Sequence, residues 1–416
     1  MNSVLRGELP MLSVEEALAQ VLAEVETPPP REVPLADALG LALDENVASD
    51  VDSPPHDKSI VDGYALIAAS VTSSPTELRV IEEVTAGQVP TRVVEPGTAT
   101  RIMTGAPIPK GADAVVMVEK TTTVSSGSEA RVRILEAPVK SGQNIVRRGA
   151  SMRRGDEVLA ADLHRRLRPV EIGLLAEVGR TTVQVLQPTA AILATGNELV
   201  PADQTPGPGQ IRNSNGPMLL ALARDAGAVP VDLGIARDDA ADLRAKIDQG
   251  LDANVLILSG GVSAGVLDLV PQVLSECGVR EVFHKVNLKP GKPLWFGTCQ
   301  REGQTRLVFG LPGNPVSSLV CFELFVRPAL LALAGQRDCV REPLQATLTK
   351  EHRQRGDRAT YWPSRLEEAA DGSPRISPLS WKGSGDLRSV VDANALAIFP
   401  GGSLYSTGSV IYALRL

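Results

Sequence analysis

Residues 255–268 read VLILSGGVSAGVLD, a continuous apolar segment that ends in a glycine-rich turn. An apolar strand of this kind is typical of a parallel sheet that is buried on both faces. Similar segments alternate with helical ones around it, with strands expected at Ala191–Ala194, Val229–Gly234, Val255–Ser259 and Leu307–Gly310, and helices at Gly216–Ala226, Ala240–Leu251, Leu267–Cys277 and Pro315–Ala334. The pattern predicts a doubly wound α/β domain over residues 187–335 within a multidomain α/β chain.

Three further parts are predicted outside this α/β domain. Residues 51–144 change to short β-branched runs divided by glycine and proline turns, which predicts an inserted β-rich module. The pieces on either side of it, 1–50 and 145–186, are expected to form one discontinuous linker domain. The tail, 336–416, returns to short strands and predicts a C-terminal β-barrel.

The composition excludes several classes of protein. The 416 residues carry 49 acidic and 42 basic side chains, a formal net charge of −7, and 43% of them are hydrophobic, which excludes wholesale disorder. The acidic balance argues against nucleic-acid binding, and apolar runs such as Val255–Leu258 are too short to span a bilayer. The four cysteines form no C-x-x-C pattern and the N-terminus lacks an apolar signal stretch. We therefore expect a cytoplasmic protein with no nucleic-acid or membrane partner.

Three glycine-rich turns follow three of the predicted strands. They read TGNE from Thr195, SGGVSAG from Ser259 and LPGNP from Leu311. The carboxyl ends of parallel strands meet at one edge of an open sheet, where ligands bind. Glycines let backbone N–H groups approach a ligand, and the helix N-termini that follow favour anions. Together the three turns predict a ligand site at this edge.

Charged residues of both signs follow the same strands. Glu198, Asp238 and Asp268 each lie after a strand or in its loop, while Lys289 and Lys292 lie in a KPGKP run. Carboxylate oxygens are the ligands that Mg²⁺ prefers, and lysines bind anions. This set predicts a Mg²⁺-bridged phosphate. Because no Walker A or G-x-G-x-x-G pattern follows a first strand, the standard NTPase and dinucleotide-binding classes lose support.

Other polar residues have a structural explanation. Ser13 and Glu16 form an S-x-x-E capping box at the start of a periodic apolar segment, which predicts a helix. Asp239 is expected to lie in the first turn of a helix, where an acidic residue favours the dipole. Asn314, which precedes a proline, is explained equally well as a helix N-cap or as part of the ligand site.

Two loops of the N-terminal half are further candidates, although either one alone is typical of an ordinary surface loop. Prolines stiffen the run before Asp57, and Asp62 begins a turn with the glycine after it, so Asp57 has the better functional case. Thr104 lies in a TGAP turn whose amides can bind an oxyanion. Arginines at 147, 148, 153, 154, 165, 166 and 168 are expected to form a solvated face, in preference to an anion-binding patch.

In order along the chain, these segments resemble the molybdopterin molybdenumtransferase family, known as MoeA in bacteria and as the E domain of gephyrin in animals. The matching runs are SPPHDKSIVDGYA, RIMTGAPIPKGADAVV, GQNIVRRG, ATGNEL, GIARDD, SGGVSAGVLD, LKPGKPLWFG, LPGNPVSS and WKGSGDLRS with ANAL. SGGVS, KPGKP and LPGNP together are highly specific. Since the runs cover nearly the whole chain, a single borrowed domain does not explain them.

The resemblance implies an enzyme that inserts molybdate into adenylylated molybdopterin, with Mg²⁺ and release of AMP, to give the molybdenum cofactor. It also implies a homodimer of four-domain subunits, whose active cleft lies between the α/β domain of one subunit and the β module of the other. Its small-molecule partners are molybdate and adenylylated molybdopterin. Other cofactor-biosynthesis proteins are candidate protein partners.

The family's functional residues map position by position onto this chain. The catalytic set that the resemblance implies is Asp57, Thr104, Glu198, Asp238 and Asp268, with Glu198, Asp238 and Asp268 as the magnesium ligands. The implied substrate-binding set is Ser259, Gly260, Gly261, Ser263, Lys289, Lys292, Pro293, Pro312, Gly313, Pro315, Ser317, Arg358 and Ser384. Within it, the molybdate side comprises Lys289, Lys292, Pro293, Ser317, Arg358 and Ser384.

One departure from the family pattern bears on function. Where the family usually has Gly-Glu-Asp after the arginines, this chain has Gly149-Ala150-Ser151, so a functional carboxylate is missing. Two alternatives to the transferase therefore stay open. One is a molybdopterin adenylyltransferase, whose family shares the α/β unit that carries SGGVS, although the extra N- and C-terminal domains argue against it. The other is a non-catalytic scaffold in the manner of gephyrin, which the missing acidic pair motivates.

Overall fold

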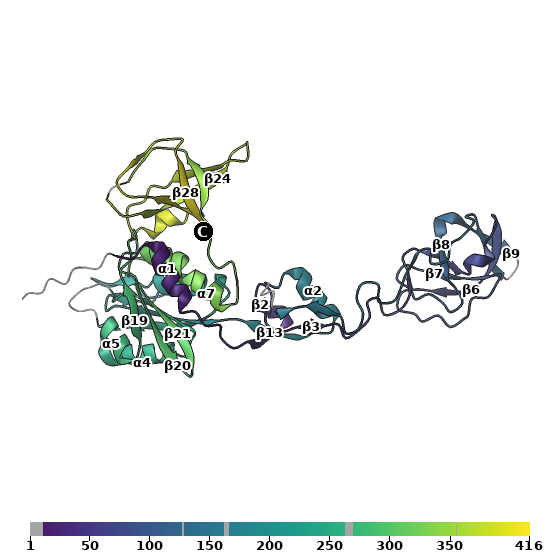
Figure 1. Cartoon of the computed structure of the whole chain (residues 1–416), viewed down its shortest axis with the longest axis horizontal. Coiled ribbons are helices and arrows are strands. Elements are labelled where there is room, and N and C mark those ends of the chain that lie inside the picture. The colour runs from purple at the N-terminus through teal and green to yellow at the C-terminus, as the bar shows by residue number, and fades with distance from the viewer. Residues whose placement is uncertain (1–10, 127–128, 162–165, 263–268, 355) are drawn as a thin grey trace, which may run out of the picture. The chain divides into compact units, whose positions relative to one another are not determined.

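The computed structural model divides the chain into two compact units. Figure 1 labels helices and strands of both units. The residues that the structure describes are 11–126, 129–161, 166–262, 269–354 and 356–416. Unit 1 comprises Met1–Asp44, Asp162–Ile172 and Thr182–Leu416, and unit 2 comprises Glu45–Ala161 and Gly173–Thr181. The sequence predicts four domains, a finer division than these two units, and this finer division stays a prediction.

A six-stranded sheet forms the centre of unit 1. Its strands are β14 (Thr189–Thr195), β17 (Val229–Ala236), β18 (Val255–Ser259), β19 (Arg280–His284), β20 (Trp295–Arg301) and β21 (Gln304–Leu311). They lie in the order β17-β14-β18-β21-β20-β19, and the first four run parallel, as the sequence predicts. The β20–β21 hairpin and the edge strand β19 add an antiparallel half that the sequence pattern did not reveal.

Helices cover both faces of this sheet. One face carries α1 (Val14–Ala23), α3 (Asn215–Asp225), α6 (Pro315–Cys321), a π-helical stretch (Phe322–Val326) and α7 (Arg327–Leu333). The other carries α4 (Ala240–Gly250) and α5 (Val270–Glu276). Successive strand residues alternate between the two layers, because Ile257 packs into the first core and Leu256 and Leu258 into the second. The unit is therefore doubly wound.

Two helix starts behave as the sequence predicts. The Ser13 hydroxyl accepts the N–H of Glu16 at 3.1 Å, and the Glu16 carboxylate accepts the N–H of Ser13 at 2.8 Å, which completes the capping box of α1. Asp239 accepts the N–H groups of Ala241 and Asp242, both at 3.0 Å, as the N-cap of α4. Asp239 is therefore used structurally.

One helical run matches the predicted helix Pro315–Ala334 but contradicts the expectation that the apolar runs are too short to span a bilayer. Pro315–Leu333 has a mean hydropathy of 1.8 over a length that can cross a membrane, yet 94% of it is buried inside the fold. It is the core helix of unit 1, and its two charged residues neutralise one another. Arg327 donates to Glu323 through Nε at 2.8 Å and through Nη2 at 2.9 Å.

The C-terminal part of unit 1 is a closed barrel, as the sequence predicts. Its strands, in spatial order, are β22 (Leu344–Leu348), β25 (Pro374–Pro378), β24 (Thr360–Glu368), β26 (Ala395–Phe399) and β28 (Val410–Arg415). The pair β23 (His352–Arg353) and β27 (Leu404–Tyr405) and a 3₁₀ turn, Leu387–Val390, accompany it. Leu396 and Leu414 pack into the core of the α/β sheet, so barrel and sheet are one body.

Short elements complete unit 1. They are a three-stranded sheet of β1 (Arg31–Pro34), β13 (Thr182–Leu186) and β2 (Ala42–Leu43), a 3₁₀ turn at Leu35–Asp37, and the pair β15 (Leu199–Val200) and β16 (Ile211–Arg212). The helix α2 (Pro169–Glu177) starts in unit 1 and ends in unit 2.

Unit 2 is built around a second six-stranded sheet, in the order β8-β5-β7-β6-β10-β9. Its strands are β5 (Gly63–Leu66), β6 (Thr76–Val84), β7 (Thr98–Ile102), β8 (Ala114–Met117), β9 (Thr121–Ser126) and β10 (Glu129–Ile134). Two short pairs, β3 (Val47–Ala48) with β12 (Glu157–Leu159) and β4 (Lys58–Ser59) with β11 (Ile145–Val146), join the chain entering the module to the chain leaving it. Single 3₁₀ turns lie at Ala68–Ser70 and Val118–Lys120.

Candidate active site

A cavity of about 700 Å³ lies at the carboxyl ends of β14, β18 and β21. The three glycine-rich turns that follow these strands line it, as the sequence predicts for this edge of the sheet. The predicted site residues in its wall are Glu198, Asp238, Ser259, Gly260, Gly261, Pro293, Pro312, Gly313 and Pro315. We call it the carboxylate cavity. Asp268 and Ser263, two further predicted site residues, lie outside the described residues.

Glu198 and Asp238 bring two carboxylates to this cavity from different loops. Asp238 is held by Asn197, whose N–H donates to Oδ2 at 3.3 Å and whose Oδ1 accepts the N–H of Asp238 at 3.2 Å. The Glu198 carboxylate folds over Gly196, where an added Cβ would lie only 2.5 Å from Glu198 Oε2. Only a glycine at 196 permits this approach.

These two side chains suit a hard cation. Within the described part of the chain, no three His, Cys, Asp or Glu side chains gather into a group that can hold a metal by themselves. Mg²⁺, however, is usually bound by one or two carboxylates together with water and substrate phosphates. Glu198 and Asp238 therefore fit Mg²⁺ brought in with a phosphate ester.

Asn215 organises the floor of the carboxylate cavity and was not predicted from the sequence. Its buried Nδ2 donates to Ser259 Oγ at 2.6 Å and to the carbonyl of Gly313 at 2.8 Å. It thereby ties the turn after β18 to the turn after β21. The sequence offers no signal for it, because an asparagine at a helix start is usually a cap.

A second cavity, of about 530 Å³, opens beside the first and is lined by cations. Lys289 and Lys292 come from the KPGKP turn and Arg358 from the barrel, and the predicted residues Ser317 and Ser384 also line it. A fourth cation, Lys382, was not predicted. Among the described residues that line this lysine cavity, none is acidic.

Hydrogen bonds hold the lysine turn, which carries Lys289 and Lys292, against the barrel loop that carries Arg358. Lys289 N–H donates to the carbonyl of Ala359 at 3.0 Å, and Tyr361 N–H donates to the carbonyl of Lys289 at 2.8 Å. Arg358 Nη1 also donates to the carbonyl of Leu288 at 3.3 Å. The barrel loop and the lysine turn, about 70 residues apart, therefore form a single wall.

The two cavities are continuous. Pro293, Pro312 and Asn314 line both of them. Asn314 precedes α6, yet its side chain makes no capping hydrogen bond, so its amide is available to the cavities. This favours the ligand-site explanation of Asn314 over the N-cap explanation. One groove thus carries carboxylates at one end and ammonium and guanidinium groups at the other.

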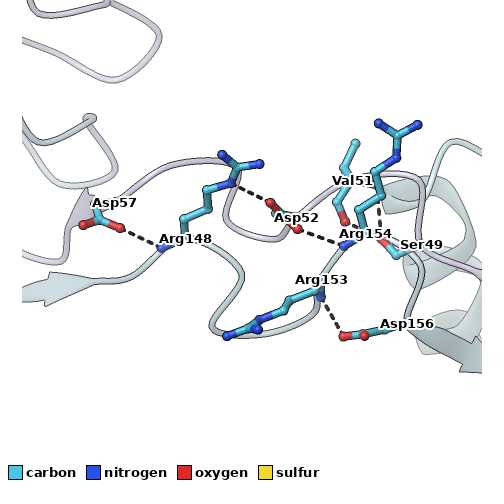
Figure 2. Close-up of polar contacts among 8 residues, drawn as sticks. All are labelled: Ser49, Val51, Asp52, Asp57, Arg148, Arg153, Arg154 and Asp156. Carbon is cyan, nitrogen blue, oxygen red and sulfur yellow. Dashed lines mark hydrogen bonds and ion pairs between the residues drawn. The ribbon is translucent and has the colours of Figure 1, made fainter.

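Asp57 lies in unit 2, within a ladder of alternating acids and arginines (Figure 2). Its Oδ1 accepts the N–H of Arg148 at 2.8 Å, and its Oδ2 accepts Arg147 Nη1 at 2.5 Å. The Arg148 N–H and the Arg147 guanidinium hold the pKa of Asp57 below its ordinary value. Arg148 Nε in turn donates to Asp52. Asp57 is therefore an oriented carboxylate at neutral pH.

Thr104 lies beside the Asp57 loop. Its N–H and its hydroxyl both donate to Asp62 Oδ1 at 2.7 Å, which lowers the pKa of Asp62. The carbonyl of Asp57 accepts the N–H of Ile108 at 2.9 Å, and the carbonyl of Ser59 accepts the N–H of Gly105 at 2.8 Å. The two candidate loops of unit 2 are thus adjacent, and Asp62 orients Thr104, a role that the sequence analysis did not assign to it.

The arginine cluster is paired with acids at several positions. Besides Arg147 and Arg148, Arg168 donates to Glu171, and this lowers the pKa of Glu171 to about 2. Figure 2 shows the guanidinium groups of Arg153 and Arg154 pointing away from the carboxylates, while their N–H groups bind Asp156 and Asp52. Position 165 lies outside the described residues.

Three family models match successive parts of the chain. Residues 12–179 match the MoeA N-terminal region (domain I and II), residues 191–332 match the probable molybdopterin binding domain, and residues 345–416 match the MoeA C-terminal region (domain IV). Together they cover both units.

Relatives of similar length match nearly the whole chain. A molybdopterin molybdenumtransferase of Bacillus subtilis is 33% identical over 97% of this chain and 94% of its own length, and one of Synechococcus elongatus is 35% identical over 94% and 96%. The crystal structure of a molybdopterin biosynthesis moeA protein from Pyrococcus horikoshii superposes with a TM-score of 0.79 at 32% identity, covering 97% of this chain and 99% of that one. The chain therefore belongs to the MoeA family of molybdopterin molybdenumtransferases.

Proposed function

We propose that this chain inserts molybdate into adenylylated molybdopterin, releases AMP and so forms the molybdenum cofactor. The observation that carries the proposal is the single groove with opposite charges at its two ends. A phosphoanhydride substrate and a tetrahedral oxyanion have to meet in this reaction. The groove offers a carboxylate end suited to a metal-bound phosphate and a cationic end suited to the oxyanion.

The residues of the lysine cavity bind and orient molybdate. Lys289, Lys292 and Arg358 supply positive charge, and Ser317 and Ser384 supply hydroxyl groups at the same cavity. An oxyanion is held by charge-assisted hydrogen bonds and needs no deep apolar pocket. Because Arg358 Nη1 also donates to the carbonyl of Leu288, its guanidinium is oriented before the oxyanion arrives.

The residues of the carboxylate cavity receive the adenylylated end of the substrate. Gly260 and Gly261 line the space, and Gly260 adopts a positive φ of +96° in which an added Cβ would lie 2.7 Å from the carbonyl of Thr195. The N–H of Gly260 donates to the carbonyl of Leu311 at 3.0 Å, which holds the turn after β18 against the end of β21. Glu198 and Asp238 would hold Mg²⁺, with Asp268 as the third expected ligand. When bound, the ion neutralises charge that develops on the phosphates.

In the proposed enzyme, Asp57 and Thr104 of one subunit act at the groove of the partner subunit. This rests on the homodimer that the family resemblance implies, and it gives unit 2 a catalytic use. The ionised and oriented Asp57 carboxylate can position a water molecule or a metal ligand. A cytoplasmic location and contacts with other cofactor-biosynthesis proteins belong to the same proposal.

The test is AMP release from purified adenylylated molybdopterin, measured with and without molybdate and with and without Mg²⁺. We expect AMP to form only when both are present, and EDTA to abolish its release in a way that excess Mg²⁺ reverses. AMP release that ignores molybdate, or no release from folded protein, contradicts the proposal.

The two alternatives have less support. An adenylyltransferase needs only the α/β unit, whereas this chain matches the N-terminal and C-terminal regions of the MoeA family as well. A non-catalytic scaffold was motivated by Ala150 and Ser151. The loop that carries Ala150 and Ser151 nevertheless keeps its position without the acidic pair, because the carbonyl of Ser53 accepts the N–H of Ser151 at 2.9 Å.

A further inference from the structure

We propose that Lys382 is a specificity-determining residue of the lysine cavity and supplies a fourth positive charge for a doubly charged oxyanion. The inference rests on the proposed function, because it takes the lysine cavity as the oxyanion site. Lys382 lines this cavity together with Lys289, Lys292 and Arg358. It comes from a loop of the barrel that follows Trp381.

The charges that line the lysine cavity are unbalanced. Four cations and no acid line the lysine cavity among the described residues, so the cations repel one another when no anion is present. The nearby acid Asp386 offsets this charge only from a distance: the Ser389 hydroxyl and, to a smaller extent, Lys382 lower its pKa, while its Oδ2 accepts the backbone N–H of Lys382 at 3.1 Å and also binds that hydroxyl. Among the described residues, the Lys382 ammonium forms no hydrogen bond or ion pair. It is therefore available to an anion.

Hydrogen bonds hold the loop that carries Lys382 in place. The carbonyl of Ser384 accepts the N–H of Val316 at the start of α6 at 3.0 Å. The Ser389 hydroxyl donates to the carbonyl of Ser380 at 2.9 Å and closes the loop on itself. These bonds hold both sides of Lys382 against the body of unit 1, so the lysine is anchored at the cavity and is not on a free tail.

An aromatic pair fixes the base of the same loop. The rings of Trp362 and Trp381 meet edge to face with centroids 4.9 Å apart, and both line the lysine cavity. Trp362 Nε1 donates to the carbonyl of Leu379 at 2.9 Å. Since such pairs restrict both rings, the main chain at Lys382 has little freedom, and the charge stays near the cavity.

The experiment measures molybdate binding directly, by equilibrium dialysis of the full-length protein with molybdate alone. Lys382→Ala should weaken binding roughly tenfold, because a charge-assisted contact is lost, and Lys382→Arg should stay within about twofold. The matched control is Lys350→Ala, an exposed lysine of the barrel that lines neither cavity, and it should bind as the unchanged protein does. Thermal unfolding verifies that each variant is folded.

Kinetics give a second readout. In the AMP-release assay, Lys382→Ala should raise the KM for molybdate about tenfold and change kcat far less, and its binding should depend less steeply on salt. Equal binding by Lys382→Ala and the unchanged protein, with Lys292→Ala impaired, overturns this inference and leaves the proposed function intact. Equal loss in Lys382→Ala and Lys382→Arg also overturns it, since shape and not charge would then matter. No binding by the unchanged protein overturns both.

Discussion

Single residues set how closely the walls of the groove approach one another. At Gly291, in the middle of the KPGKP turn, φ is +125° and an added Cβ would lie 2.6 Å from Cys321 Sγ and 2.8 Å from Leu288 Cδ2. Cys321 is buried in α6. The lysine turn can therefore rest directly on the core helix only because neither position carries a larger group.

Replacing this glycine should move the turn. Gly291→Ala is expected to cost about 2–3 kcal/mol of unfolding free energy, from backbone strain and overpacking together, and to raise the KM for molybdate. Urea unfolding and the AMP-release assay measure the two effects. The control is Gly278→Ala, where φ is +83° but nothing lies within 4 Å of the added Cβ. It should cost only about 1 kcal/mol and leave KM unchanged. Equal costs at the two positions would contradict the packing argument.

Single elements are stabilised by local charge as well as by burial. The helix α2 begins at an arrangement in which the Glu171 carboxylate accepts the N–H of Arg168 at 3.0 Å and also pairs with the Arg168 guanidinium. The carboxylate is almost fully buried, while the arginine is largely exposed. Because the ionised form has these partners, the pKa of Glu171 falls to about 2.

This shift predicts a pH-dependent stability. Unfolded glutamate has a pKa of about 4.3, so the folded value is depressed, and the stabilisation is present above pH 4.3 and lost as the pH falls toward 2. Glu171→Gln should therefore lower the unfolding free energy by about 1–2 kcal/mol at pH 7. This is less than the pKa shift alone would give, because solvent screens the charge of the exposed arginine. The difference should shrink below about pH 4 and vanish only below about pH 2. Glu177→Gln, at the other end of α2, is the control, and a pH-independent difference for Glu171→Gln would refute the assignment.

For the whole molecule, the proposal is that two copies of the chain build each site. The carboxylate and lysine cavities lie entirely in unit 1, whereas Asp57 and Thr104 lie in unit 2. In the proposed homodimer, the groove of one subunit receives unit 2 of the other. A defect in unit 1 and a defect in unit 2 can then be carried by different subunits of one dimer.

Mixing subunits tests this arrangement. Asp57→Ala and Lys292→Ala proteins, each inactive alone, should recover about a quarter of the normal activity when they are unfolded together and refolded, since half the dimers are mixed and each has one intact site. The control mixture is Glu198→Ala with Lys292→Ala. Both changes lie in unit 1, so every site keeps a defect and no activity should return. Recovery in the control, or none in the test mixture, argues against a shared site.

The sequence by itself determined most of the elements and predicted the edge of the sheet at which the carboxylate cavity lies. The Ser13–Glu16 capping box, the apolar strand Val255–Ser259 and the glycine turns each depend on neighbours a few residues away, so their patterns can be read along the chain. The carboxyl-edge rule then placed Glu198 and Asp238 at one cavity. The sequence analysis missed the hairpin β20–β21. A strand that is buried on both faces has the same apolar pattern whether it runs parallel or antiparallel to its neighbour.

The tertiary structure alone decided which distant side chains meet. Arg147 reaches Asp57 across 90 residues, and Arg358 of the barrel reaches the carbonyl that precedes Lys289 across 70. Asn215 and Lys382 joined the groove without any local signal, since their positions depend on how the helices and the barrel pack on the sheet. Such contacts depend on how segments that lie far apart in the sequence pack together in the folded chain. Local periodicity predicts an element and its buried face, whereas the meeting of charges across the groove requires the folded chain.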